Sequence, residues 1–188
     1  VDTMQATANG HSQVLIIGDD SGTDGESSAI FMSAINATNR GIKILSERQS
    51  SNNNHDLIFQ TSPDGAVPTE KLRITSDGDL QRPKSLSQEV STSVSSTSAT
   101  SCGSFAKATY RSAYVIAQIT QGSSYQVGRY LVIHDGTTAT TIEESAIATG
   151  DMLGTFSGVV SGSNVEFRVT MSSASSATVI TKIESIVV

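Results

Sequence analysis

From residue 110 to residue 188, apolar and polar residues alternate in six segments, which are connected by short turns rich in Gly, Asp, Ser and Asn. Because successive side chains of a β-strand point to opposite faces, this two-residue period is typical of strands with one buried face. Short turns between consecutive strands favour antiparallel pairing. The pattern predicts an antiparallel β-sandwich, or a jelly-roll-like form of it. The predicted strands lie within residues 110–120, 125–136, 137–149, 153–162, 164–173 and 177–188.

The segment NVEFRVT at 164–170 shows the alternation clearly. Val165, Phe167 and Val169 are predicted to face the core, and the residues between them are predicted to face outward. A shift of one residue in the pairing would exchange the two sets, so the register of this strand should be well specified.

The N-terminal part of the chain contains shorter runs of the same kind. Apolar runs at 14–17 and 29–35 flank a Gly/Asp-rich loop, and alternating runs follow at 41–47 and 56–62. In KLRITSDGDL at 71–80 the alternation leads directly into Asp-Gly, a dipeptide typical of tight turns. This region is therefore predicted to consist of short strands joined by turns.

A region of about 80 residues built from such short strands makes a poor isolated domain. Its aromatic residues are Phe31 and Phe59 alone, and short strands bury little apolar surface. The burial does not comfortably offset the loss of chain entropy on folding. We therefore expect this region to pack against neighbouring chains.

The segment from 85 to 104 is rich in hydroxyl side chains, with Ser or Thr at 12 of its 20 positions. Such a composition is typical of a flexible linker. However, Leu86, Val90 and Val94 all occupy even positions, as in a half-exposed strand. We favour a strand, and a short helical seam remains an alternative because the three residues are four apart.

The composition argues against an enzyme and against a nucleic-acid-binding protein. Only 16% of the residues are charged, so few side chains can donate or accept protons. Binding to a phosphate backbone requires clustered Lys and Arg, whereas the formal net charge is -6. No apolar run approaches the roughly 20 residues that span a bilayer. We expect no catalytic residue, no cofactor, no nucleic-acid partner and no membrane insertion.

The loop GDDSGTDGE at 18–26 gathers carboxylates, whose oxygens suit a hard cation such as calcium. Its spacing departs from the EF-hand loop, because Gly22 and Phe31 occupy positions where ligands belong. We interpret the loop as a solvated turn and expect no metal, with calcium binding as the alternative. The carboxylates concerned are Asp19, Asp20, Asp24 and Glu26.

The His and Cys residues form no recognisable motif. His11, His55 and His134 lie in or beside predicted turns, and none is at a metal-ligand spacing from another His or from the cysteine. A single His could meet its copies across a trimer axis, but surface positions explain all three. Cys102, the single cysteine, excludes a disulfide within this sequence, and no signature supports it as a nucleophile with His134 as base.

The segment NNNHDLIFQTSPDGAVPTEKLRITSDGDL at 52–80 resembles a module that recurs in bacteriophage tail fibres and other virion appendage proteins. The matching pieces are DLIFQTS at 56–62, the connection to Thr69, and EKLRITSDG at 70–78. In that family such segments belong to homotrimeric fibres, whose short strands wrap around a shared axis. The resemblance implies a short-stranded, trimeric fibre-type region and would supply the missing neighbours.

The C-terminal part resembles a β-sandwich found in virion structural proteins of marine phages, notably those that infect cyanobacteria. The resemblance rests on segments such as YRSAYVIAQIT at 110–120 and MLGTFSGVVSG at 152–162. Arg129 stands where the family has an acidic residue, and Cys102-Gly103 where it has an apolar-acidic pair. The resemblance implies the sandwich fold and no catalytic residues.

We therefore predict an all-β protein with a fibre-shaft-like region over 1–84, a connection or first strand over 85–104, and a β-sandwich over 105–188. Its predicted function is that of a non-enzymatic virion protein, a homotrimeric tail fibre or appendage that attaches the phage to its host. Expected partners are further copies of the chain, other virion proteins, and a host surface glycan or outer-membrane protein.

Receptor contact would fall on exposed turn residues of the C-terminal domain. Side chains with an apolar body and a polar tip suit both sugars and proteins. The candidates are Tyr125, His134, Asp135 and Asn164.

Two other functions remain as alternatives. The chain could be a decoration, neck or adaptor protein of the virion that touches no host; a large apolar patch on the sandwich would favour this function, and a polar, grooved tip would favour receptor binding. A glycan depolymerase of the tailspike type would need two carboxylates in a groove, and the shortage of aromatic residues argues against it.

Overall fold

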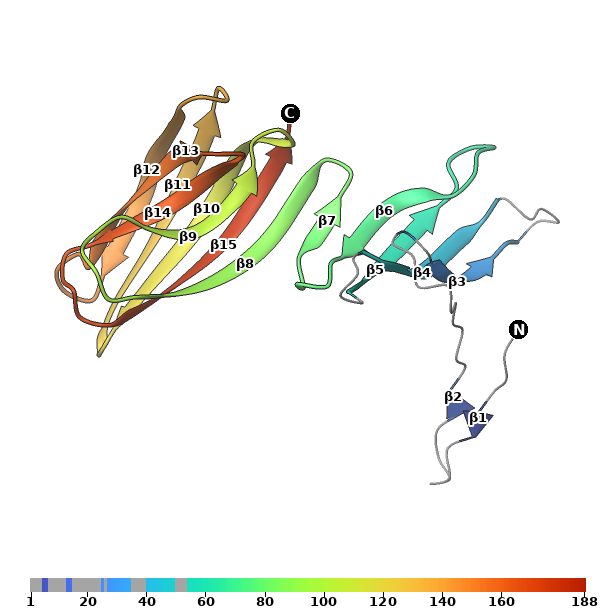
Figure 1. Ribbon diagram of the computed structural model, residues 1–188, viewed down its shortest axis with the longest axis horizontal. Coiled ribbons are helices and arrows are strands. Elements are labelled where there is room, and N and C mark those ends of the chain that lie inside the picture. Colours follow the sequence, from blue (N-terminus) through green and yellow to red (C-terminus); the bar gives the residue numbers. More distant parts are fainter. Residues whose placement is uncertain (1–4, 7–12, 15–24, 26, 35–39, 50–53) are drawn as a thin grey trace. The chain divides into compact units, whose positions relative to one another are not determined.

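In the computed structural model the chain is all-β, as predicted. Every regular element that the structure describes is a strand, and all strand pairing is antiparallel. The chain divides into two compact units, Val1–Pro83 and Lys84–Val188, whose strands are labelled in Figure 1. The structure describes residues 5–6, 13–14, 25, 27–34, 40–49 and 54–188.

The N-terminal unit contains a small two-stranded ladder and a larger sheet. The ladder pairs β1 with β2, and the sheet has the strand order β3-β4-β5-β6-β7. The strands are β1 (Gln5–Ala6), β2 (Gln13–Val14), β3 (Ser27–Met32), β4 (Ile42–Arg48), β5 (His55–Thr61), β6 (Thr69–Ile74) and β7 (Leu80–Arg82). The tight turn predicted at Asp77-Gly78 joins β6 to β7, and Gly78 has the positive φ of 90° that such a turn requires.

The sheet of the N-terminal unit has two unequal faces. On one face Leu45 lies opposite Ile58, and both are buried. The other face is here called the N-terminal apolar face. The cross-strand register places nine apolar side chains on it, none of them buried. They are Ile30, Met32, Ile42, Ile44, Leu57, Phe59, Leu72, Ile74 and Leu80.

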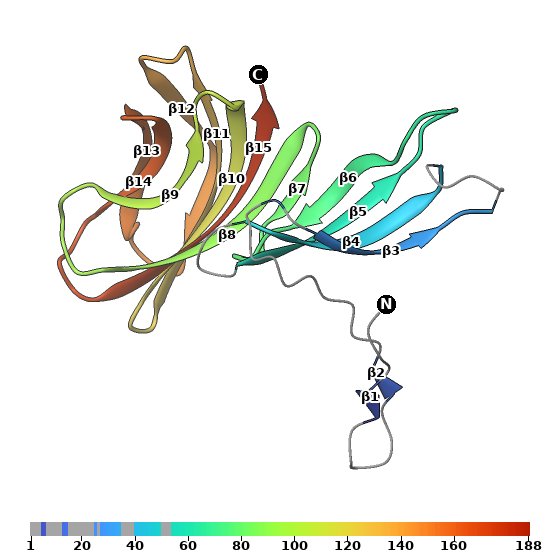
Figure 2. The ribbon, with the colours of Figure 1, turned by 45° about the vertical axis from the view of Figure 1, so that its right-hand side comes forward.

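The C-terminal unit is a β-sandwich of two antiparallel sheets, which Figure 2 shows as separate layers. Five strands pair in the order β12-β11-β10-β15-β8, and three pair in the order β13-β14-β9. The strands are β8 (Ser85–Val94), β9 (Thr100–Ala106), β10 (Tyr110–Gln121), β11 (Ser124–His134), β12 (Ala139–Ala148), β13 (Gly154–Ser161), β14 (Asn164–Met171) and β15 (Ala177–Val187).

The Ser/Thr-rich segment supplies strands to this sandwich. Its first half is β8, which pairs along its whole length with β15, from Ser85 opposite Ile186 to Val94 opposite Ala177. The even-numbered side chains Leu86 and Val94 face the core, as the two-residue period predicts. The second half of the segment leads into β9 in the other sheet.

Three aromatic rings fill the centre of the sandwich. Tyr130 comes from the five-stranded sheet, and Phe156 and Phe167 come from the three-stranded one. The ring centroids of Tyr130 lie 5.0 Å from Phe156 and 5.3 Å from Phe167, and the two Phe rings stack at 5.1 Å. The prediction that Val165, Phe167 and Val169 face the core is confirmed, because all three are buried.

Buried polar side chains connect the two sheets. Gln126 of β11 donates from Nε2 to the carbonyl of Gly154, and its Oε1 accepts from the backbone N–H groups of Leu153 and Gly154, at 2.7 and 3.0 Å. Thr181 of β15 donates to the carbonyl of Cys102. Because both the nitrogen and the oxygen of its buried amide have hydrogen-bond partners, Gln126 stabilises the contact between the sheets without leaving either atom unpaired.

A β-bulge lies where Thr181 meets β9. The register of β9 against β14 shifts between Glu166 and Arg168, so that Cys102 and Gly103 together face Phe167. Gly103 has a φ of 149°, and a Cβ at this position would lie 2.4 Å from the Cδ1 of Ile183. The backbone conformation therefore favours glycine here, and a larger residue would also have to displace the end of the Ile183 side chain.

Candidate binding surface

The structure does not bring the predicted contact residues together. Tyr125 lies at the start of β11 and His134 at its end, about 30 Å apart at the usual rise of a strand. Asn164 begins β14 in the other sheet and is half-buried. Tyr125 and Asp135 are exposed. The four residues form no single contact site.

The prediction that His134 is an exposed turn residue is wrong, since its side chain is only 4% exposed. Its Nδ1 accepts a hydrogen bond from the backbone N–H of Gly136 at 2.9 Å, and its Nε2 lies 2.7 Å from the carbonyl oxygen of Tyr110. This pattern assigns the proton to Nε2, which donates to that carbonyl. The two-residue period that places Tyr130 and Val132 inward also reaches His134, so the signal was present in the sequence.

Asp135 organises the turn between β11 and β12. Its Oδ1 accepts hydrogen bonds from the backbone N–H groups of Thr138 and Thr137, at 2.7 and 2.8 Å. These two donors lower the pKa of Asp135 below its ordinary value, with that of Thr138 contributing most. Asp135 therefore has a structural role in the turn. Any role of this side chain in receptor contact would come in addition to that structural role.

We predict that the turn loosens in acid. Because the pKa of Asp135 is lower in the folded state than in the unfolded state, its contribution to stability is complete above the ordinary pKa of about 3.9 and is lost as the pH falls through the lowered folded value. The amide NMR shifts of Thr137 and Thr138 should titrate together in that range. Asp135→Asn keeps the acceptor oxygen and should abolish this titration; an unchanged titration in Asp135→Asn would contradict the assignment.

Cys102 is buried and unsuited to nucleophilic attack. Its Sγ donates to the carbonyl of Phe167 in the sandwich core, and burial raises the pKa of the thiol to about 12. The thiolate is the nucleophilic form of cysteine, and it is scarce at neutral pH when the pKa is so high.

The carboxylates considered for calcium, Asp19, Asp20, Asp24 and Glu26, lie outside the described residues, as does His11. Among the residues that the structure describes, no three His, Cys, Asp or Glu side chains are grouped so that they could hold a metal ion. His55 lies on β5, where its Nδ1 is 3.2 Å from the hydroxyl of Ser46.

A cluster of charges holds the N-terminal sheet together around Arg73. Its guanidinium binds Asp56 at 2.5 Å, Glu70 at 2.8 Å and Glu47 at 3.0 Å. Asp56 also accepts from the backbone N–H of Ser76, which lies in the turn after β6. These carboxylates, Glu70 foremost, raise the pKa of Arg73 above its ordinary value. One side chain thus connects β4, β5, β6 and the following turn.

A second apolar surface is the outward face of the five-stranded sheet, here called the C-terminal outer face. Eight of its aliphatic side chains are 38–69% exposed. They lie on four adjacent strands, whereas the outward residues of β8 are Ser and Glu. The eight are Ile116, Val127, Leu131, Ile133, Ile142, Ile147, Ile180 and Ile186.

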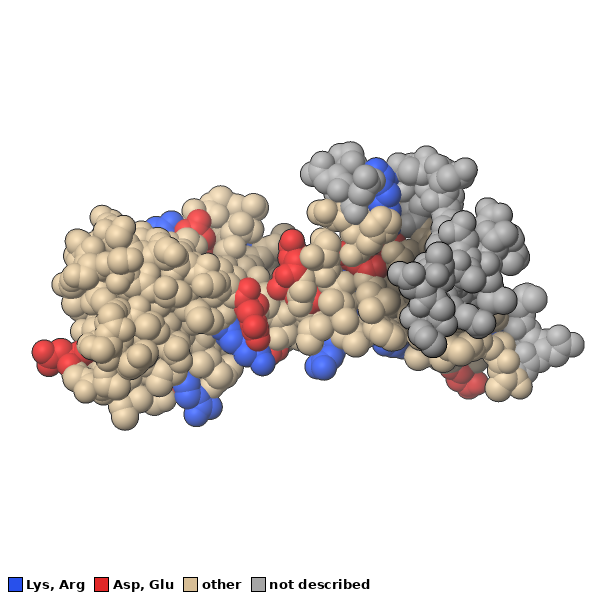
Figure 3. Space-filling model, turned by 90° about the horizontal axis from the view of Figure 1, so that it is seen from below, with Lys and Arg blue, Asp and Glu red and all other residues tan. Residues whose placement is uncertain are grey.

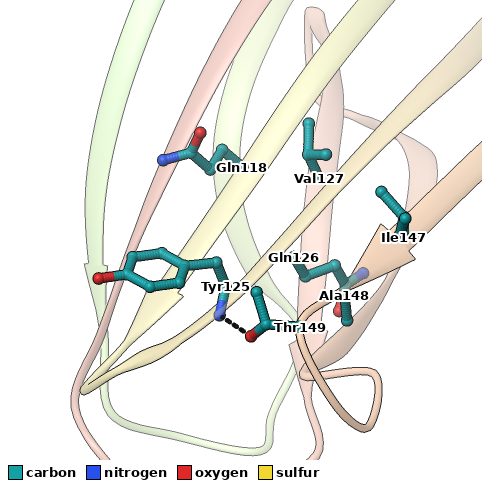
Figure 4. Close-up of a pocket in the computed structure, with 7 residues that line it drawn as sticks. All are labelled: Gln118, Tyr125, Gln126, Val127, Ile147, Ala148 and Thr149. Atoms are coloured by element: carbon teal, nitrogen blue, oxygen red, sulfur yellow. Dashed lines mark hydrogen bonds between the residues drawn. The ribbon is translucent and has the colours of Figure 1, made fainter.

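Two hollows lie at this apolar surface. One has a volume of about 390 Å³ and includes Tyr114, Leu131, Ile133, Ile142 and Ile186 in its lining. The other, of about 290 Å³, lies beside Tyr125 and is drawn in Figure 4 with its lining residues. The backbone N–H of Tyr125 donates to the hydroxyl of Thr149 at its rim, the dashed line in that figure. Neither hollow is lined by an Asp or Glu.

Charged residues on the C-terminal outer face are few. Arg129 donates a hydrogen bond to the hydroxyl of Tyr114, and its guanidinium carbon lies 5.5 Å from the centre of that ring. Lys182 lies 3.6 Å from Glu184 on the same strand. On the side of the molecule seen in Figure 3, charged side chains over the C-terminal unit are sparse and scattered.

The sequence contains a signal for this apolar face in uninterrupted apolar runs within two strands. In an alternating strand the outward residues are polar, but β10 contains Val115-Ile116 and β11 contains Leu131-Val132-Ile133 without interruption. Such runs are typical of strands that are covered on both faces.

No protein-family model matches the chain, and no curated protein matches it. The described residues form no helix long and apolar enough to cross a membrane.

Proposed function

We propose that the chain is a non-enzymatic structural protein of a phage virion, a tail fibre or similar appendage that assembles as a homotrimer. The observation that carries the proposal is the N-terminal apolar face. A domain is normally built from at least two packed layers, and this sheet exposes Ile30, Met32, Ile42, Leu57 and Leu80 to 39–46%. Other copies of the chain would cover this exposed face.

The residues that resemble the fibre module support the proposal because they are the ones that hold this sheet together. Arg73 and Glu70 come from EKLRITSDG, and Asp56 comes from DLIFQTS. The Asp-Gly of the same motif forms the turn that returns the chain to the sheet. The motif thus maintains a short-stranded sheet with one exposed apolar face, as assembly through that face would need.

In this proposal the protein works by rigid assembly. Three chains bury strand faces against one another, and three copies of each surface then act together, so that weak single contacts suffice. The two hollows of the sandwich lack carboxylates in their linings, so they offer no acid and base for cleavage of a glycan.

The C-terminal outer face bears on what the sandwich contacts. An apolar patch with few charges suits a protein surface better than a glycan, which needs polar partners. Of the two functions considered, docking within the virion is favoured by this face over contact with a host glycan. The proposed function still includes attachment of the phage to a protein on the host surface.

The mass of the full chain in solution tests the proposal. Light scattering across a dilution series should give three times the monomer mass of 19.6 kDa. A monomer at all concentrations would overturn the homotrimer and leave a sandwich-bearing protein that docks singly.

A further inference from the structure

We infer that the C-terminal outer face is a contact surface between copies of this chain, with the outward residues of β10, β11 and β12 at its centre. The inference rests on the proposed function, because it names the surface through which the C-terminal units associate. The inference goes beyond the proposed function because it places a contact between copies on the sandwich as well as on the N-terminal sheet. Three observations support the inference: the area of the face, the net charge of the C-terminal unit and the arrangement of side chains on the face.

The area is that of a stable interface. The strands of this sheet are 10 to 12 residues long. With strands about 4.8 Å apart and a rise of about 3.3 Å per residue, the face measures about 24 by 33 Å, or about 800 Å². A standard protein interface covers about 800 Å² of each partner. The face is therefore large enough to hold two copies together.

The charge of the C-terminal unit permits contact between identical surfaces. Residues 84–188 contain six Lys or Arg and seven Asp or Glu, a net charge of -1, whereas residues 1–83 contain six and eleven, a net charge of -5; together these give the -6 of the chain. Copies of a nearly neutral unit do not repel one another, and low net charge promotes association. Copies can therefore meet through the sandwich with little charge penalty.

The side chains are arranged as in a protein interface, with an apolar centre and a polar flank. Leu131 and Ile142 lie side by side on β11 and β12, next to Tyr114 on β10. Arg129 is held over the ring of Tyr114, so two residue types that often dominate binding energy are already ordered at the centre. The flank is β8, whose outward residues include Ser87 and Ser91.

The first test compares two lysine variants of the full chain. Leu131→Lys places a charge at the centre of the C-terminal outer face, and Thr170→Lys places one on the exposed outward side of the other sheet. Both positions are exposed, so both variants should keep the far-UV circular dichroism of the wild type. We expect Leu131→Lys to form a smaller species than the wild type at equal concentration, and Thr170→Lys to match the wild type.

An oligomeric wild type whose mass is unchanged by Leu131→Lys would overturn the inference and leave the homotrimer standing. Loss of mass in both variants alike would also overturn it, because the effect would not belong to this face. A monomeric wild type would overturn both the inference and the proposed function. The outcomes therefore separate the two.

A second measurement does not depend on a disruptive change. Thr140→Cys puts a thiol at the rim of the larger hollow, and Ser163→Cys puts one in the β13–β14 turn of the other sheet. Cys102 is buried and contributes little background. Maleimide labelling of Thr140→Cys should slow as concentration rises through assembly, while labelling of Ser163→Cys stays constant. A constant rate at Thr140→Cys during assembly would overturn the inference.

Discussion

Replacing Phe167 with alanine is expected to lower the free energy of unfolding of the C-terminal unit by about 3–5 kcal/mol. Phe167 is 1% exposed and contacts both Tyr130 and Phe156. Its removal leaves a cavity between the two sheets, where the rings of Tyr130 and Phe156 lose their contacts with it.

Chemical denaturation followed by Tyr fluorescence measures this loss, since the chain contains no Trp. Thr170→Ala is the matched control, because Thr170 lies on the same strand with its side chain exposed. Its effect should stay within about 0.5 kcal/mol. A Phe167→Ala variant that loses no more than this control would show that the aromatic cluster does not hold the sheets together.

Replacing Arg73 with methionine should destabilise the N-terminal sheet by about 1.5–3 kcal/mol, because charge-assisted hydrogen bonds in a part-buried cluster are lost. Methionine keeps much of the aliphatic length of arginine but leaves Glu47, Asp56 and Glu70 facing one another without a cation. The uncompensated negative charge is most destabilising at Asp56, because this carboxylate is buried. Amide hydrogen exchange of β5 and β6 in the full chain would report the loss.

A double variant separates the charge effect from packing. Asp56→Asn in the Arg73→Met background removes the buried uncompensated charge, so the double variant should exchange more slowly than Arg73→Met alone. Arg82→Met on β7 is the control for loss of a surface cation, since Arg82 is exposed. If Arg82→Met accelerates exchange as much as Arg73→Met, the cluster around Arg73 has no special role.

The sequence was sufficient to predict most strands of the C-terminal unit, because a period of two residues is a local property; of the run predicted at 14–17, residues 15–17 lie outside the described residues. The alternation in NVEFRVT identified Val165, Phe167 and Val169 as core residues, and Asp77-Gly78 marked the turn before β7. The division of strands between two sheets was not visible, since it depends on pairings such as β8 with β15 that join opposite ends of the unit.

The contact residues were harder to predict because a turn residue was assumed to be exposed. His134 is the last inward residue of its strand, and its partners, Gly136 and the carbonyl of Tyr110, include a backbone group brought close only by folding. Arg73 likewise reaches carboxylates on three strands, which no short motif reveals. The C-terminal outer face was not predicted, because a two-residue period identifies the inward residues of a strand and implies that the outward residues are polar.

The pairing of β8 with β15 also determines how the sandwich responds to mechanical load. The first residue of β8 lies opposite the last part of β15, and the N–H of Val187 donates to the carbonyl of Lys84. A force that pulls these two adjacent ends apart breaks the hydrogen bonds between the strands one after another, as in unzipping, and does not load them all in shear. The sandwich should therefore unfold at low force when tension is applied between the start of β8 and the end of β15. It is better suited to a position that carries no tension than to one that transmits tension.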